Sequence, residues 1–130
     1  MQAKGEFDVN LKPLDAFAKG RHGVNLGRMS IDKTFHGDLI GKSLGEMLSA
    51  MTGVKGSAGY VAIEQVNGSL QGKNGAFVLQ HFGILDRGQE RLVLEVVPDS
   101  GTGDLEGLAG KMLIIIENGK HFYEFEYMLG

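Results

Sequence analysis

Four polar side chains interrupt otherwise apolar stretches of this sequence, and they are its best candidates for chemistry. Glu64 lies in "VAIEQV", Gln80 and His81 are neighbours in "FVLQHFG", and Glu95 lies in "LVLEVV". Burying an unpaired polar group is costly, so each of these groups needs a partner or a purpose. A carboxylate such as Glu64 can hold a histidine ring on a neighbouring strand and raise the pKa of its imidazole.

Side chains alternate between the two faces of a strand, which limits how these groups can combine. Tyr60 and Glu64 share one face of their segment, whereas Gln80 and His81 occupy opposite faces of theirs. The sequence leaves open whether Glu64 and His81 form a functional pair or a structural hydrogen bond. The candidate ligand-binding residues are Glu64, His81, Gln80, Tyr60, Glu95 and Tyr123.

The sequence offers little evidence for a metal site or for a nucleophilic catalytic group. The four histidines His22, His36, His81 and His121 lie on separate segments, and no two have the spacing that would place them together on a strand or helix. No metal site is therefore predicted. The chain has no cysteine nucleophile and no nucleophile-elbow motif, and the sequence assigns no catalytic residue and no cofactor.

The elements that carry these residues have the period of β-strands. Three segments alternate apolar and polar residues, as half-exposed strands do: "EFDVNLK", "RMSIDKTFHG" and "HFYEFEYML". Four others, at 59–66, 75–85, 91–97 and 111–117, are apolar on both faces. Their second face must be covered. We therefore expect a homo-oligomer, unless another part of the same chain supplies the cover.

Short turns connect the predicted strands. Asn-Gly pairs at 67–68, 74–75 and 118–119, and "DRG" at 86–88, are typical of hairpins because these residues readily adopt positive φ. The predicted strands are 3–11, 27–36, 38–50, 58–66, 69–72, 76–85, 90–97, 111–117 and 120–128. Eight or nine such strands in a single domain, residues 1–130, predict an all-β fold, a closed antiparallel barrel with room for one small ligand.

Two features complicate this count. Residues 42–51 have a capping-box spacing, Ser43 with Glu46, and apolar residues at helical intervals, so their pattern fits a helix as well as a strand. A pentapeptide of the form Gly-[Asp/Ser]-Leu-x-Gly also occurs three times, at 37–41, 68–72 and 103–107. Its copies predict strand corners anchored by a buried leucine. Anion-binding loops are the alternative, which the carboxylates in the third copy disfavour.

Composition excludes several function classes. The net charge is −3 and the basic residues are scattered, so we expect no nucleic-acid partner. No stretch has the length and apolarity of a signal peptide core or a membrane span, and there are no cysteines. These features predict a cytoplasmic protein with no membrane partner.

The series "KTFHGDLIG", "GYVAIEQVNGSLQGKNGAFVLQHFGILD" and "VVPDSGTGDLEGLAG" resembles a family of small bacterial proteins of unknown function. Their fold belongs with the allene oxide cyclase-like β-barrels. The resemblance covers roughly residues 27–129; it implies a closed barrel related in shape to the calycins, and a strand at 42–51. It carries no established reaction.

Three functional hypotheses follow. The first is a binding module whose barrel interior takes a small hydrophobic or amphipathic molecule. The second is an isomerase or cyclase that folds an apolar substrate in a rigid pocket while a carboxylate steadies charge, as the resemblance implies. The third is a structural oligomer with a filled barrel. The presence or absence of a cavity distinguishes the third from the others.

Overall fold

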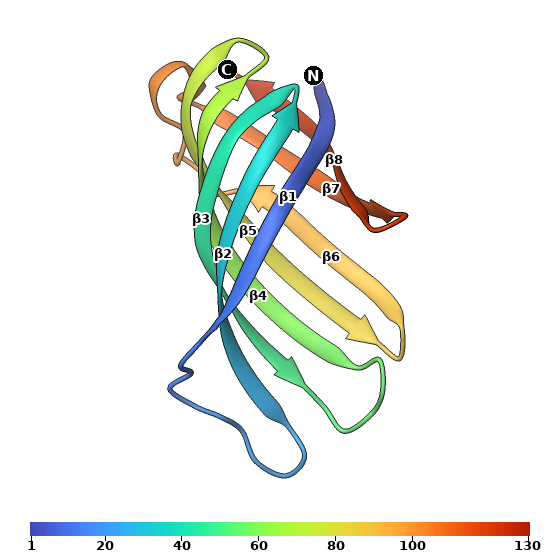
Figure 1. Ribbon diagram of the computed structural model, residues 1–130. Helices are drawn as coiled ribbons and strands as arrows, with labels where there is room; N and C mark the ends of the chain where they lie inside the picture. Colours follow the sequence, from blue (N-terminus) through green and yellow to red (C-terminus); the bar gives the residue numbers. More distant parts are fainter.

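Eight antiparallel strands form the closed barrel that the sequence predicts (Figure 1). The computed structural model describes residues 1–130. The strands are β1 (Gln2–Leu14), β2 (Asn25–Gly37), β3 (Leu39–Met51), β4 (Ala58–Leu70), β5 (Lys73–Asp86), β6 (Gln89–Val96), β7 (Leu108–Glu117) and β8 (Lys120–Leu129), with one 3₁₀ turn, η1 (Gly103–Leu105). Each strand pairs with the next, and β8 closes the barrel on β1.

The predicted ninth strand, 69–72, does not exist, and two of the predicted Asn-Gly turns are wrong. β4 continues through Asn67-Gly68 to Leu70, and Asn74-Gly75 lies inside β5, paired with Ser69 and Gly68. The hairpin turn is instead Gln71-Gly72, where both residues have positive φ. The Asn118-Gly119 turn is confirmed, and the turn after β5 has two residues, Arg87 and Gly88.

Glycine is required at 68 for close approach between strands rather than for a turn. A Cβ at this position would lie 2.1 Å from the carbonyl oxygen of Ile40 on β3. Gly41, Gly68 and Gly75 are paired across three strands, so the wall of the barrel curves most tightly through this row. Local turn propensity was therefore overridden by the packing of neighbouring strands.

Residues 42–51 belong to β3, as the family resemblance implies. Leu44 and Leu48 point outward and are exposed, whereas Ser43 is buried, which is the alternation of a strand and not the stripe of a helix. Gly45 lies opposite Glu64, and a Cβ there would be 2.6 Å from the Cα of Glu64. The glycine that weakens the helical pattern thus makes room for a neighbouring strand.

The three pentapeptides form corners, with their leucines buried in the core. Leu39 and Leu70 are paired on β3 and β4, and Leu105 in η1 packs against Gly75 of β5. All three therefore lie at one end of the barrel, which we call the leucine end. The opposite end, where Met51, Ala58 and Leu85 meet on β3, β4 and β5, we call the pocket end.

The wall is least complete between β6 and β7. These strands share a single ladder pair, Glu95 with Lys111, and they diverge toward the pocket end (Figure 1). The loop 97–107 crosses the leucine end between them. There the Thr102 N–H donates a hydrogen bond to the Ala76 carbonyl on β5, and the Thr102 hydroxyl accepts one from the Ala76 N–H. One end of the barrel is thus sealed by chain and side chains, while the other is open.

Candidate functional site

A buried ionic cluster lies midway along the barrel interior, with Glu64 at its centre. Glu64 Oε2 accepts a hydrogen bond from Lys33 Nζ at 2.7 Å and also contacts His81 Nε2. Glu64 Oε1 accepts a hydrogen bond from Ser43 Oγ at 2.7 Å. All four side chains are buried, and no buried side-chain polar atom of the protein is left without a partner.

Four consecutive strands bring these groups together. Lys33, Ser43, Glu64 and His81 come from β2, β3, β4 and β5, each at an inward position of its strand. The pairing of Glu64 with Gly45 lets β3 and β4 approach closely at this level. The ammonium of Lys33 also lies 4.9 Å from the centroid of the Phe7 ring, which stabilises the buried cation.

The partners of Glu64 keep it ionised. Burial by itself raises the pKa of this carboxyl, but the hydrogen bond from His81 and the charge of Lys33 outweigh burial and lower the pKa to about 2. A carboxylate held ionised and fully hydrogen-bonded is a poor general acid at neutral pH. The arrangement is that of a satisfied structural cluster.

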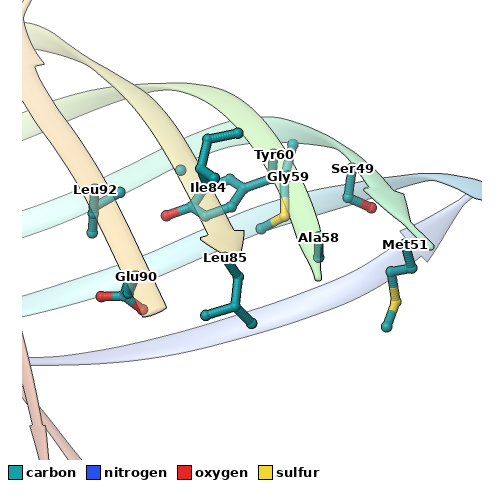
Figure 2. A pocket seen from close by; sticks show the side chains of 11 residues that line it. Ser49, Met51, Ala58, Gly59, Tyr60, Ile84, Leu85, Glu90 and Leu92 are labelled. Atoms are coloured by element: carbon teal, nitrogen blue, oxygen red, sulfur yellow. The ribbon is translucent and has the colours of Figure 1, made fainter. Parts of the chain in front are cut away.

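The pocket end holds a cavity of about 260 Å³ that opens to solvent (Figure 2). Its wall is mainly apolar and comes from β3, β4, β5 and β6. The apolar lining consists of Met47, Met51, Ala58, Ile84, Leu85 and Leu92 with Gly59 and Gly83. Ser49, Tyr60 and Glu90 are the polar lining residues, and Glu90 is the only charged one.

Tyr60 separates this pocket from the ionic cluster. Its ring packs directly over Gly83, where a Cβ would lie only 2.2 Å from the ring. The centroid of the Tyr60 ring is 6.2 Å from that of the His81 ring. Burial is the main cause that raises the pKa of the Tyr60 hydroxyl, and the negative charges of Glu90 and Glu64 raise it further. Because Glu90 is the one charged lining residue, the pocket carries a negative charge.

The structure brings together only part of the predicted residue set. Glu64 and His81 meet inside the barrel and Tyr60 lines the pocket, but Gln80 and Glu95 pair on the outer surface. Tyr123 lies at the leucine end, where its hydroxyl accepts a hydrogen bond from the Leu39 N–H and donates one to the His36 carbonyl, both at 2.8 Å. Tyr123 thus has a structural place, far from the pocket.

Sequence reasoning missed Lys33, Ser43, Ser49 and Glu90. Lys33 had a signal, since it lies between Ile31 and Phe35 on the apolar face of its segment. Ser43, Ser49 and Glu90 had none, because serine and glutamate are also ordinary exposed residues of strands. The structure shows no group of three or more His, Cys, Asp or Glu side chains that could hold a metal ion. It has no helix of the length and apolarity needed to cross a membrane.

The fold and the site define a class of protein: an eight-stranded antiparallel barrel filled at one end, with a small apolar pocket at the other. The chain belongs to the family described as "Protein of unknown function (DUF3224)", whose family model matches residues 3–127. It is similar to a crystal structure of a DUF3224 protein of unknown function from Shewanella oneidensis MR-1. The two share 64% sequence identity and a TM-score of 0.98, over 100% of this chain and 97% of that one. No curated protein matches the chain.

Proposed function

We propose that this protein binds a small amphipathic molecule in the pocket at the pocket end, with a cationic amine of the ligand beside Glu90. The observation that carries the proposal is the cavity of about 260 Å³ with an apolar wall and one charged side chain. Binding sites for small molecules are typically concave and apolar with a few placed polar groups.

The ligand is small because the rest of the interior is occupied. Small-molecule pockets typically measure roughly 300–1,000 Å³, so this cavity is near the lower limit. From Tyr60 toward the leucine end, the interior contains first the ionic cluster and then the packed core. We therefore expect the ligand to occupy only the pocket end of the barrel and not its whole length. The hypothesis of a filled structural barrel fits the leucine end alone.

The charge of the lining favours an amine over an acid. Glu90 stands at the mouth, and no lysine or arginine lines the pocket. A ligand carboxylate would meet only another carboxylate, whereas an ammonium group would gain an ion pair. The thioethers of Met47 and Met51 give the apolar part of the ligand an adaptable wall.

Binding of n-hexylamine and of its neutral analogue n-hexanol tests this proposal by NMR titration of backbone amides. Both probes are expected to shift amides of Ser49, Gly59 and Gly83, and the amine is expected to bind more tightly. Ala58→Phe, which fills the pocket, should abolish both titrations, while the matched Ala109→Phe on the exposed surface of β7 should not. Saturable shifts that survive Ala58→Phe would contradict the pocket.

Glu90→Gln separates the two parts of the proposal. This variant should lose the preference for hexylamine and keep the affinity for hexanol. If hexanol binds in the pocket but the wild-type protein does not prefer the amine, the amine assignment is wrong and the apolar site stands.

A second candidate is an isomerase or cyclase that acts on an apolar substrate in the same pocket. The resemblance of the sequence to the allene oxide cyclase-like barrels supports it, together with a hydroxyl, Tyr60, and a carboxylate, Glu90, that line the cavity. Glu64 has no exposed surface and would act only through its field. Native mass spectrometry of protein purified from its source would identify a bound compound. Turnover of that compound unchanged in Glu64→Gln would remove Glu64 from any mechanism.

We also propose a cytoplasmic location, which the lack of cysteine supports.

A further inference from the structure

We infer that the outer face of β3–β6 is a two-fold interface between two copies of this chain. This face carries seven large apolar side chains that are 45–66% exposed: Ile40, Leu44, Leu48, Val61, Ile63, Phe82 and Val93. Four of them, Leu48, Val61, Phe82 and Val93, are cross-strand partners and form one continuous row. Contiguous exposed apolar surface of this kind marks interaction sites.

The rows on either side of this apolar row differ in charge and in side-chain size. On the side toward the leucine end, Glu46, Ile63, Gln80 and Glu95 form the next outward row, in which Ile63 is 55% exposed. The first three of these residues line a shallow hollow of about 520 Å³. On the side toward the pocket end, the corresponding row is Ala50, Gly59, Ile84 and Arg91. These four residues belong to the lining of a hollow of about 420 Å³. The first row thus carries two carboxylates and the large side chain of Ile63, whereas the second carries the cation of Arg91 and no side chain at Gly59.

A two-fold axis along the apolar row brings these two sides together. Rotation by 180° about that line places the apolar row on its own copy and exchanges the flanking rows. Ile63 then meets the hollow at Gly59 of the second copy, and Glu95 meets its Arg91. Because a two-fold interface is self-complementary, each contact occurs twice.

Charge also disfavours the other in-plane axis. A two-fold axis parallel to the strands would place Glu95 against Glu46 of the second copy, since both lie in the same row on opposite sides of the patch. Juxtaposed like charges are costly at an interface. Glu46 is moreover engaged by Arg28 at 2.6 Å within its own chain, which leaves Arg91 as the partner for Glu95. The second copy is therefore the occupant that the patch fits.

Sedimentation velocity tests this inference across a concentration series. The wild-type protein is expected to sediment as a dimer at micromolar concentration, and Phe82→Lys should convert it to a monomer. Leu113→Lys on β7 is the matched control, because Leu113 is equally apolar and 63% exposed but lies outside the patch. It should leave the dimer intact. Circular dichroism verifies that both variants are folded.

Charge reversal tests the axis itself. Arg91→Glu and Glu95→Arg should each raise the dimer dissociation constant about tenfold or more, since each places two like-charged pairs in the interface. The double variant should restore dimerisation, because it recreates both pairs with their signs exchanged. A monomeric wild-type protein, a trimer, or a double variant as weak as the singles would overturn the inference. Glu95 lies opposite Lys111 in the one ladder pair that joins β6 and β7. Thermal unfolding of each variant is therefore measured alongside.

Discussion

The two ends of this barrel use their inward side chains differently. At the leucine end, Leu39, Leu70 and Leu105 are at most 1% exposed and Tyr123 is anchored by backbone hydrogen bonds. At the pocket end, residues at equivalent inward positions, such as Met47 and Leu85, remain partly exposed around a cavity. Close packing is thus concentrated at one end, and the other is left incomplete around the pocket for which we propose a ligand.

The ionic cluster marks the boundary between the two ends. It fills the interior with polar groups that hydrogen-bond to one another, which prevents the pocket from extending toward the leucine end. Buried ion pairs add less stability than apolar packing of the same volume, but breaking one is strongly destabilising. The largest change in unfolding free energy is therefore expected from substitutions at this boundary.

Replacing Glu64 by Ala should have the largest effect on stability. The change leaves the buried ammonium of Lys33 without its carboxylate, which costs about 3–5 kcal/mol. The control Glu6→Ala, at an exposed position of β1 outside the proposed interface, should change the unfolding free energy by less than about 1 kcal/mol. Urea unfolding of both variants at equal protein concentration provides the measurement. A loss for Glu64→Ala no larger than the control would show that the cluster is not a structural boundary.

The same cluster predicts how stability depends on pH. The pKa of Glu64 is about 2 in the folded protein against an ordinary value of 4.5, so its ionisation stabilises the fold above pH 4.5. That contribution, roughly 3 kcal/mol, is lost as the pH falls from 4.5 toward 2. The difference in unfolding free energy between wild-type protein and Glu64→Gln should therefore shrink over this interval. A difference that stays constant from pH 6 to pH 2.5 would contradict the lowered pKa.

Much of the leucine end could be predicted from the sequence, and little of the pocket end. Alternation of apolar residues and the repeated glycine–leucine pattern predicted the barrel, its corners and the residues that share a strand face with Glu64 and with His81, but left open whether these faces point inward. These features are local, because side-chain period and corner glycines are properties of short segments. The wrong turns at 67–68 and 74–75 show the limit: Gly68 serves the backbone of β3, which no local pattern reveals.

The pocket is space that the inward side chains of several strands leave unfilled, and no single segment of the sequence shows such a space. Ser49, Tyr60 and Glu90 become neighbours only after four strands, β3 to β6, are placed in register. Tyr60 and Tyr123 are both tyrosines on apolar faces, yet one lines a pocket and the other anchors a corner. Residue type alone could not separate them. The position of each along the barrel axis decides its role.

A smaller effect is expected from glycine substitutions at the two ends. Gly68→Ala at the leucine end forces a Cβ to within 2.1 Å of the Ile40 carbonyl oxygen, and the required backbone shift should cost about 1–3 kcal/mol. Gly53→Ala in the loop at the pocket end meets no atom closer than 3.9 Å and should be nearly neutral. Thermal unfolding followed by circular dichroism compares them. Equal effects would mean that the glycine row is not under strand-packing constraint.

The smallest predicted difference is also the most closely matched, because the same atom is removed at each end. Tyr123→Phe leaves the buried N–H of Leu39 without its acceptor, which should cost about 1–3 kcal/mol. Tyr60→Phe removes a hydroxyl from a pocket that is open to solvent, where water can hydrogen-bond to it. Its cost should be below about 0.5 kcal/mol. Because Tyr60 faces the proposed ligand, this variant should instead alter the hexylamine titration while Tyr123→Phe leaves it unchanged. Loss of stability in Tyr60→Phe as large as in Tyr123→Phe would place a structural hydrogen bond at the pocket end and remove the division between a stabilising end and a binding end.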